Sequence, residues 1–344
     1  MPRSLAVHGT GMERADACSR RRPRAPRAAS GRGARGTTIN RIEKNFAGRT
    51  GVVLALAEGL RLHQWAKNLL IFVPLLLSGT IDNLEAWGLC LLGFVAWGVL
   101  ASCTYLLNDL LDLRFDRTHW SKWRRPIARG DLPIGLVAIV VPLGMLISLA
   151  AVASVNHRAA VVLLIYTALT FAYSVGLKRL PVVDVLILAM LYTLRLFFGI
   201  ELANVATSSW LLVFSMFIFT SLSLAKRFTE IMRNANLGRE KVDGRGYVVK
   251  DGPLIFGLGL STAAGAVLIM VLYLINEAFG ATFYRSPLLL WPVPAILFLW
   301  LGRIWLLAGR DQLDDDPIRF AIRDPASLAL GAGVVAAFAG AWLV

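Results

Sequence analysis

Residues 87–107 read WGLCLLGFVAWGVLASCTYLL and are followed at once by NDLLD at 108–112. An α-helix needs about 20 predominantly apolar residues to cross a hydrocarbon core about 30 Å thick, and residues 87–107 supply that length without a charge. Further runs of this kind cover 132–154 and 159–173. The chain is 56% apolar and 17% charged, whereas soluble domains carry roughly 25% charged residues. The sequence therefore predicts an all-α membrane protein.

Hydropathy predicts about nine membrane-spanning helices, and the connections between them alternate in charge. The segments at 79–85 and 203–208 hold no Lys or Arg, whereas those at 108–131 and 227–252 are longer and rich in both. Cytoplasmic loops carry an excess of Lys and Arg, so the alternation places the N-terminus in the cytoplasm and the C-terminus outside. We expect helices at 64–78, 86–107, 132–154, 158–175, 181–202, 209–226, 253–275, 287–308 and 325–344.

The first 49 residues carry twelve Lys or Arg and three acidic residues, and so most of the net charge of +14. Such a basic segment with almost no apolar content is expected to be disordered. It is either a cytoplasmic tail that touches anionic lipid or the product of a gene start assigned too early. We therefore separate a basic tail, residues 1–50, from a transmembrane domain, residues 51–344, and expect membrane lipids rather than nucleic acid as partners.

Cysteine and histidine give no sign of a metal centre. Cys18, Cys90 and Cys103 stand at unrelated spacings, which favours neither a disulfide framework nor a metal knot. The four histidines include no His-x-x-x-His pair, which argues against a zinc site.

Three carboxylates stand at the predicted cytoplasmic end of the second helix. Asp109, Asp112 and Asp116 share one face if the helix continues beyond the membrane, because their spacing is i, i+3 and i+7. Carboxylates that point together repel one another unless a cation lies between them, and Mg²⁺ typically takes one or two carboxylates plus substrate phosphate oxygens. Solvated charges at a helix end are the alternative interpretation.

Four basic residues follow in the same predicted loop, Lys122, Arg124, Arg125 and Arg129. Ordinary positive-inside charge explains one or two of them, but it does not explain the carboxylates beside them. A metal-bridged diphosphate requires both kinds of charge, because the metal neutralises some oxygens and Arg or Lys binds the rest.

Polar residues also occur inside two other predicted helices. A charge such as Arg195 in mid-helix costs at least ~2.5–3.5 kcal/mol, so it usually faces a polar cavity. Asp184 lies about 16 Å away along the same helix, so we expect a shared cavity rather than a direct pair. Four polar residues recur at helical spacing at the first helix, and such a polar stripe suits a phosphate-bearing cleft. They are Arg61, Gln64, Lys67 and Asn68.

The pattern N-D-x-x-D-x-x-x-D at 108–116, followed by R-P-I at 125–127, resembles the first motif of the UbiA superfamily of intramembrane prenyltransferases. The resemblance extends over residues 58–344. R-x-x-Q-W-x-K-N at 61–68 is similar to the family's first-helix signature, and Y-S-x-x-L-K at 173–178 to the segment that closes its fourth helix. It implies a bundle of about nine helices in which the first motif binds Mg²⁺ and the donor diphosphate. The resemblance also implies that Asn108, Tyr173 and Lys178 bind substrate.

The resemblance has one departure, after the sixth predicted helix. Aromatic and quinone-forming members carry a second acidic motif of the kind D-x-x-Y-A-x-x-D there, whereas this chain has Lys226, Arg227 and Glu230. That pattern is more similar to the branch containing decaprenyl-phosphate phosphoribosyltransferase, whose donor is phosphoribosyl diphosphate and whose acceptor is a polyprenyl phosphate. Lys226 and Arg227 would attract an anionic acceptor directly, unless they only mark a positively charged helix end.

The sequence thus favours a Mg²⁺-dependent membrane transferase that uses a diphosphate-activated donor and a polyprenyl lipid. Its most specific form is phosphoribosyl transfer from phosphoribosyl diphosphate to polyprenyl phosphate, at a site facing the cytoplasm of the cell membrane. The expected roles are Mg²⁺ binding by Asp109, Asp112 and Asp116, pyrophosphate stabilisation by Lys122, Arg124 and Arg125, and lipid-phosphate binding by Lys67, Lys178, Lys226 and Arg227.

Two other functions remain open at this stage. An aromatic or quinone-precursor prenyltransferase would use an isoprenyl diphosphate, and the missing second acidic motif argues against it. A non-enzymatic lipid transporter is the third and most remote alternative. Transporters built from repeats place broken helices symmetrically about the membrane midplane, and this sequence has no such pair of segments. The oligomeric state is not predicted.

Overall fold

Eight helices in the described part of the chain are long and apolar enough to cross a membrane, and a ninth crossing is made by shorter helices. The prediction of an all-α protein with about nine spans is confirmed. The predicted tail, residues 1–50, lies outside the described residues except for its last three. The structure, a computed structural model, describes residues 48–118, 122–242, 244–313, 320–321 and 323–344.

Each long helix overlaps one span predicted from hydropathy, with ends shifted by up to ten residues. Their bounds are α3 Leu84–Leu111, α6 Ile134–Ala153, α7 His157–Val175, α8 Val183–Ala203, α9 Ser209–Asn236, α10 Gly252–Tyr273, α11 Pro292–Gly309 and α13 Pro325–Leu343.

Side-chain caps fix where several of these helices begin. Asn83 Oδ1 accepts a hydrogen bond from the N–H of Ala86 at the start of α3 (3.1 Å), and Ser208 Oγ accepts one from Leu211 at the start of α9 (2.9 Å). Asp324 caps α13 in the same way. These oxygens pair N–H groups of the first turn that have no partner within the helix.

The first crossing differs from the ordinary helix expected at 64–78. It consists of a 3₁₀ helix, η1 (Leu62–Phe72), continued by a short α-helix, α2 (Val73–Leu77), with Pro74 in its first turn. A 3₁₀ helix rises about 2.0 Å per residue and an α-helix about 1.5 Å, so the two together extend over about 30 Å. Sixteen residues therefore cover a hydrocarbon core that usually takes about 20.

Helix α9 is ten residues longer than the predicted span 209–226. Lys226, Arg227 and Glu230 therefore lie within a helix rather than in the loop after it, which corrects the sequence-based placement. Hydropathy marks where a helix leaves the apolar layer, whereas the backbone hydrogen bonds continue as long as residues favour helix.

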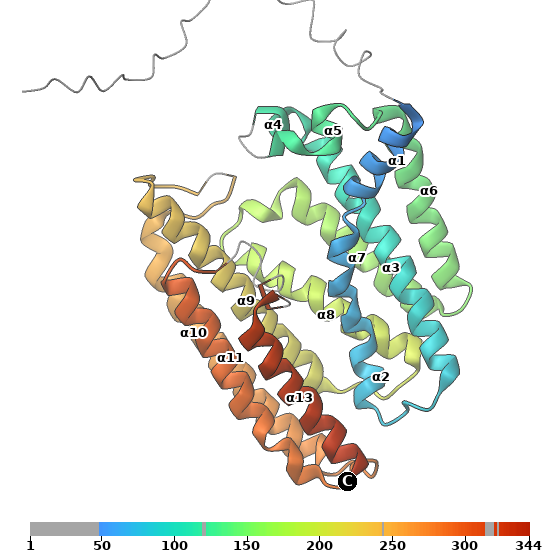
Figure 1. Cartoon of the computed structure of the whole chain (residues 1–344), viewed down its shortest axis with the longest axis vertical. Coiled ribbons are helices and arrows are strands. Elements are labelled where there is room, and N and C mark those ends of the chain that lie inside the picture. Colours follow the sequence, from blue (N-terminus) through green and yellow to red (C-terminus); the bar gives the residue numbers. More distant parts are fainter. Residues whose placement is uncertain (1–47, 119–121, 243, 314–319, 322) are drawn as a thin grey trace, which may run out of the picture. The chain divides into compact units, whose positions relative to one another are not determined.

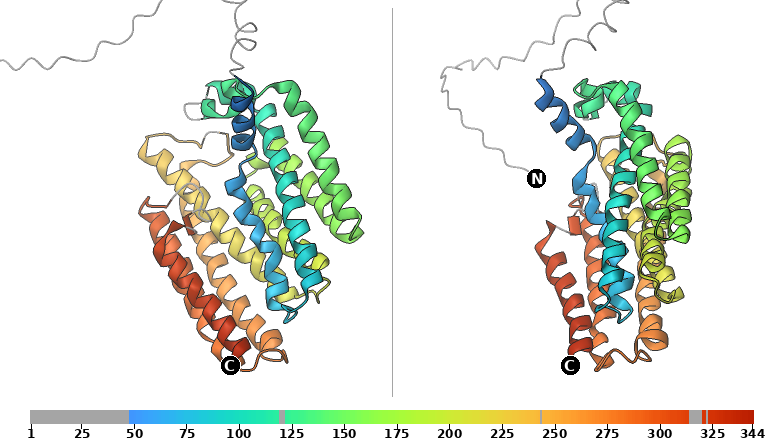
Figure 2. Two further views of the ribbon diagram at one scale, coloured as in Figure 1. Left: turned by 45° about the vertical axis from the view of Figure 1, so that its right-hand side comes forward. Right: turned by 90° about the vertical axis from the view of Figure 1, so that its right-hand side faces the viewer.

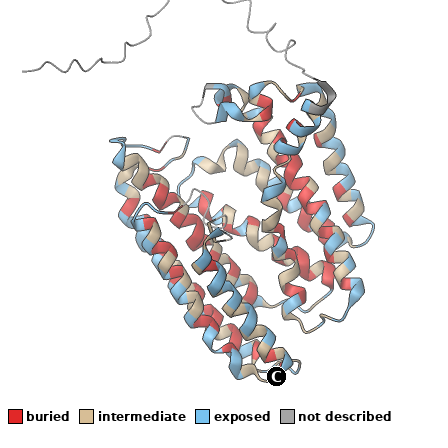
Figure 3. Ribbon diagram, in the orientation of Figure 1, coloured by how far each residue is buried: buried red, intermediate tan, exposed pale blue. Residues whose placement is uncertain are grey.

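Helix α8 lies between two groups of helices (Figure 1). It packs against η1, α2, α3 and α7 on one side and against α9 on the other, where α10, α11 and α13 continue the bundle. In the apolar part of α3, 61% of the residues are buried, against 11% in α13, so α3 is central and α13 peripheral (Figure 3). The end of α13 lies opposite the short helices α4 (Leu113–Thr118) and α5 (Pro126–Arg129) (Figure 2).

The first crossing packs directly onto the α8 backbone at Gly199. A Cβ atom at this position would stand 2.1 Å from the carbonyl oxygen of Ile71. Small residues of this kind let membrane helices approach closely. Gly199 thus sets how near η1 comes to α8, and η1 carries Lys67 and Asn68.

We expect Gly199→Ala to destabilise the bundle, because the opposing atom is backbone and cannot rotate away. Overpacking costs about 1–3 kcal/mol, which lowers Tm by several degrees. The measurement is thermal unfolding of the purified protein in detergent. Gly302→Ala in α11, where a Cβ would meet nothing within 4 Å, is the control. An unchanged Tm for Gly199→Ala would contradict the close approach.

Candidate active site

A cavity of about 390 Å³ lies between η1, α3, α7, α8 and α9. Seven of its lining side chains are cationic, and no Asp or Glu occurs among the described residues that line it. A cavity with this wall is suited to several anionic groups at once. The cations are Arg61, Lys67, Arg125, Arg195, Lys226, Arg227 and Arg245.

Two buried carboxylates stand behind this wall, Asp109 in the last turn of α3 and Asp116 in α4. Arg61 Nη2 donates to both oxygens of Asp109 (2.7 Å each), and Arg125 Nη1 donates to Asp109 Oδ1 at 2.9 Å. The same nitrogen of Arg125 lies 2.6 Å from Asp116 Oδ2. Asp109 and Asp116 therefore already converge on one cationic atom, an arrangement that suits a shared metal ion.

Arg61 reaches Asp109 from an unusual backbone conformation. It has φ 51° and ψ 48°, between α1 (Gly48–Gly59) and η1. A non-glycine residue in this left-handed region costs of order 1–3 kcal/mol. The double hydrogen bond to Asp109 and the contact of the guanidinium with the Tyr105 ring, 5.0 Å from its centroid, hold the residue there.

Asp112 stands apart from the other two acidic residues. Helix α3 ends at Leu111, Asp112 is its C-cap, and Asp116 belongs to α4, so the face that a continuous helix would provide is interrupted. Asp112 Oδ2 instead lies 3.6 Å from Lys178 Nζ and accepts from Asn108 Nδ2 at 3.3 Å. Within the described ranges, no three His, Cys, Asp or Glu side chains could together hold a metal ion. A three-carboxylate Mg²⁺ site stays a prediction.

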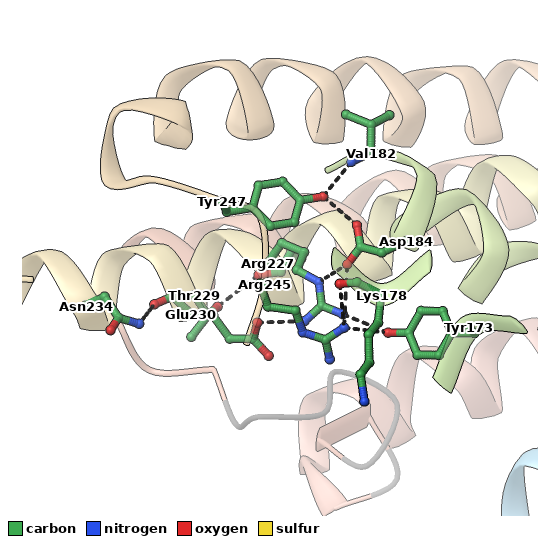
Figure 4. Close-up of polar contacts among 11 residues, drawn as sticks. Tyr173, Lys178, Val182, Asp184, Arg227, Thr229, Glu230, Asn234, Arg245 and Tyr247 are labelled. Atoms are coloured by element: carbon green, nitrogen blue, oxygen red, sulfur yellow. Dashed lines mark hydrogen bonds and ion pairs between the residues drawn. The ribbon is translucent and has the colours of Figure 1, made fainter. Parts of the chain in front are cut away.

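Two arginines meet at the α9 side of the cavity (Figure 4). Arg227 donates to Asp184 Oδ2 and Glu230 Oε2 (2.6 Å each) and to the Tyr173 hydroxyl at 3.3 Å. Arg245 Nη1 donates to the same hydroxyl at 2.8 Å. Both guanidinium groups therefore converge on one oxygen atom at the cavity wall, and Asp184 and Glu230 orient Arg227 from behind.

Tyr247 anchors the segment that carries Arg245. Its buried hydroxyl donates to Asp184 Oδ1 (2.6 Å) and accepts from the N–H of Val182 (2.8 Å). Burial and the bond to Asp184 raise the pKa of Tyr247, so the phenol keeps the proton that it donates. Val182 has φ 67° and ψ −44°, which is a strained conformation for a β-branched residue. The anchored loop thus places Arg245 at the cavity.

Arg195 lines the deeper part of the cavity together with Lys67. Arg195 is only 5% exposed. Its donors reach the Asn68 amide oxygen (3.1 Å), the Leu191 carbonyl (2.5 Å) and the Tyr166 hydroxyl (3.1 Å). All three acceptors are neutral.

The structure separates the other sequence-predicted residues into two groups. Asn108 and Tyr173 line the cavity, while Asp184 and Glu230 lie behind Arg227. The short 3₁₀ helix η2 (Lys122–Arg124) lies at the surface. Of the basic residues between 122 and 129, only Arg125 lines the cavity. The predicted substrate-binding residues that neither line the cavity nor lie behind Arg227 are Gln64, Asn68, Lys122, Arg124 and Lys178.

Several residues that lie at the site are not expected from the sequence. Tyr105 stands one turn before Asp109 on α3, a spacing that could have pointed to it. Arg245 and Tyr247 belong to a connection between two spans, and nothing in their local sequence shows that the loop folds back onto the bundle. The unassigned residues are Tyr105, Tyr166, Arg245 and Tyr247.

We expect Tyr247→Phe to loosen the loop that carries Arg245. The substitution keeps the ring but leaves the Val182 N–H and one oxygen of buried Asp184 without this partner, at about 1–3 kcal/mol. Faster proteolytic cleavage within residues 237–251 and a lower Tm are the expected results. Equal cleavage rates and Tm values in both proteins would mean that the hydroxyl does not anchor the loop.

Comparison with curated proteins shows three informative relatives. The chain is 43% identical to protein y4nM of Sinorhizobium fredii over 281 residues, 81% of this chain and 54% of that protein. It is 30% identical to nodulation protein NoeC of Azorhizobium caulinodans, over 80% of this chain and 89% of that protein. It is 31% identical to decaprenyl-phosphate phosphoribosyltransferase of Mycobacterium tuberculosis, over 52% of this chain and 61% of that protein. The chain thus spans about half the length of y4nM.

Solved structures share the fold at low identity. A UbiA homolog from Archaeoglobus fulgidus bound to GPP and Mg²⁺ matches with a TM-score of 0.60 at 15% identity, over 83% of this chain and 99% of that one. The structure of a digeranylgeranylglyceryl phosphate synthase also gives 0.60 at 15% identity, over 85% and 99%. The UbiA prenyltransferase family itself matches residues 69–342. The chain therefore belongs to the UbiA prenyltransferase family and is a multi-pass membrane protein.

Proposed function

We propose that the protein transfers a phosphoribosyl group from phosphoribosyl diphosphate to a polyprenyl phosphate. The observation that carries this proposal is the cavity wall of seven cations without an Asp or Glu among the described lining residues. Donor and acceptor together bring three anionic groups, which are a diphosphate, a sugar phosphate and a lipid phosphate. An isoprenyl diphosphate with a neutral acceptor brings only one anionic group, the diphosphate.

We divide the cations into three groups by position, and this number matches the three anionic groups of the proposed substrates. One group lies at the carboxylates, one in the deep part of the cavity, and one on α9 with its anchored loop. The likeness to a decaprenyl-phosphate phosphoribosyltransferase over 52% of the chain supports the same choice of substrates. The groups are Arg61 with Arg125, Lys67 with Arg195, and Lys226 with Arg227 and Arg245.

The residues at the end of α3 fit the magnesium ion that this reaction implies. Asp109 and Asp116 already share one cationic nitrogen, that of Arg125, and Mg²⁺ commonly takes two carboxylates plus substrate phosphate oxygens. We propose that Asp109 and Asp116 hold the ion. Bound magnesium neutralises diphosphate oxygens and so makes pyrophosphate a better leaving group.

An apolar groove of about 660 Å³ adjoins the cavity and suits the polyprenyl chain. It runs between η1 and α2 on one side and α9 and α13 on the other, and Leu70, Ile218 and Phe338 contribute to its walls. Phe219 of the groove stacks on Tyr192 of the cavity, with ring centroids 4.6 Å apart. A lipid chain in this groove brings its phosphate to the cationic cavity.

The residues of this chain then position the reactants and stabilise the departing group. A phosphate oxygen of the acceptor forms a bond with the anomeric carbon of ribose, while the bond from that carbon to pyrophosphate breaks. Arg125 and Arg61 donate hydrogen bonds where negative charge develops on the leaving group. An oxocarbenium-like ribose needs little more than this and a positioned nucleophile.

We also propose that the end of the bundle with α4 and α5 faces the cytoplasm. The first helix-connecting segment there is rich in Arg and Lys, and cytoplasmic loops carry this excess. The donor would then enter from the aqueous side, while the acceptor arrives from the bilayer.

The decisive test is incubation of membranes containing the protein with one of two labelled donors. We expect label from phosphoribosyl diphosphate to enter the lipid fraction when polyprenyl phosphate is added, and EDTA to abolish this transfer. Membranes without the protein serve as the control. Label that reaches lipid only from an isoprenyl diphosphate would replace our proposal with the prenyltransferase alternative.

We expect Asp109→Asn to lower kcat about 100-fold or more, because it weakens both the ion site and the ion pairs with Arg61 and Arg125. Thermal unfolding of the variant separates this effect from loss of the fold. Asp82→Asn, at an exposed position between α2 and α3, removes the same charge and should leave turnover unchanged. Full Mg²⁺-dependent turnover in Asp109→Asn would refute the assignment.

A further inference from the structure

Arg195 is a buried cation without a buried counter-ion. Across the part of the chain that the structure describes, no Asp or Glu lies within ion-pair distance of it. Around the guanidinium lie the rings of Trp97, Tyr166 and Tyr192, with centroids 5.0–5.4 Å away. Neutral acceptors and ring faces reduce the cost of an unpaired charge in an apolar bundle, but they do not neutralise it.

Two hydrogen-bond donors beside Arg195 are also unsatisfied. Asn68 is 2% exposed, and its Oδ1 accepts from Arg195 Nε, which leaves Nδ2 without a partner among the described residues. Turning the amide over would set its NH₂ group against the guanidinium, so the orientation is fixed. Nε1 of fully buried Trp97 likewise has no partner there. Neither Asn68 nor Trp97 lines the cavity, but both leave the positive potential around Arg195 uncompensated, which favours an anion at the guanidinium.

The cavity wall next to Arg195 meets the apolar groove. Lys67 stands with Arg195 in the cavity, while Leu70, one turn along η1, lines the groove. On α8 the neighbouring residue Leu196 lines the groove as well. The described residues of the groove walls themselves include no Lys or Arg. Lys67 and Arg195 are the cavity cations that stand nearest in sequence to groove residues, so the head of an amphiphile in the groove would meet them.

We propose that Arg195 and Lys67 form the binding site for the phosphate of the lipid acceptor. This inference rests on the proposed function and deepens it, because it divides the three phosphates among the cations. The acceptor phosphate pairs with Arg195 in the interior, and the donor takes the cations nearer α4 and α9. An uncharged acceptor leaves Arg195 without its counter-ion, so the site selects an anionic lipid over the corresponding alcohol.

The assignment also gives Lys67 and Arg195 a positioning role in the transfer. They hold the nucleophilic phosphate from the groove side, while Arg61 and Arg125, which line the cavity and pair with Asp109, meet the leaving pyrophosphate. No proton needs to move, because a phosphate dianion attacks directly and pyrophosphate carries away the bonding electrons.

The test measures ligand binding to the purified protein, by thermal shift and by equilibrium dialysis with labelled ligand. The probes are farnesyl phosphate, farnesol, inorganic phosphate and ribose 5-phosphate. We expect farnesyl phosphate to bind at least about tenfold more tightly than farnesol or inorganic phosphate. Arg195→Gln and Lys67→Gln should each remove that preference while leaving the affinity for ribose 5-phosphate unchanged. The control is Arg239→Gln, which removes an exposed positive charge from the loop after α9.

Several outcomes would overturn the proposal. One is equal binding of farnesyl phosphate and farnesol by the wild-type protein. Another is a loss of ribose 5-phosphate affinity in Arg195→Gln, which would assign the subsite to the donor. Tighter binding of inorganic phosphate than of farnesyl phosphate would assign it to a free anion. If Arg195→Gln does not fold, Lys67→Gln and the more conservative Arg195→Lys decide the question by the same criteria.

Turnover separates this proposal from the function on which it rests. If the wild-type protein transfers phosphoribose but Arg195→Lys and Lys67→Gln keep the wild-type KM for polyprenyl phosphate, the subsite is wrong and the function stands. If no phosphoribosyl transfer occurs but farnesyl phosphate binding depends on Arg195, the function is wrong and the lipid-phosphate site stands. Both proposals are supported if the wild-type protein transfers phosphoribose and each variant raises the KM for polyprenyl phosphate about tenfold. The KM for phosphoribosyl diphosphate should stay unchanged.

Discussion

The paired charges of Asp109, Arg61 and Arg125 are the interaction around which this end of the bundle is built. Asp109 is 2% exposed, and a buried carboxylate is tolerated only when cations and hydrogen bonds compensate its lost hydration. Arg61 supplies them from the turn before η1, and Arg125 from the turn before α5, where it also binds Asp116. The Asp109 carboxylate and its two arginines thereby hold together α3, α4, the turn before η1 and the turn before α5.

A similar ion pair organises the other side of the cavity. Asp184 is fully buried on α8 and binds Arg227 of α9 and Tyr247 of the following loop. In both places the carboxylate lies behind the wall and the cations line it. The buried carboxylates thus orient arginines toward the cavity. The cavity lining is therefore cationic and attracts anions, although carboxylates lie behind it.

The cationic cavity and the apolar groove contrast in polarity, and under the proposed function they would receive reactants from two phases. The polar wall suits a water-soluble, multiply charged donor, and the apolar groove between α2 and α13 suits a polyprenyl chain. Tyr192 and Phe219 stack at the boundary between them. Helix α8 contributes to both spaces, which is why Arg195 and Leu196, neighbours in sequence, face different environments.

The sequence by itself determined the membrane class, about nine spans, and the segment at 108–116 with its acidic residues, because length, hydropathy and charge are local properties. It also singled out Arg195, since a charge in a long apolar run is visible without a structure. It did not place Arg227 within α9, because hydropathy reports the edge of the apolar layer and not the end of the helix.

Only the tertiary structure decided which of these charges meet. The break at Asp112 separates that residue from Asp109 and Asp116, and the folded-back loop brings Arg245 to Tyr173 from 72 positions away. Such contacts depend on how helices cross and where loops return, and no local pattern encodes either. The pairing of Asp109 with Arg61, across 48 positions, follows from the same packing of elements distant in sequence.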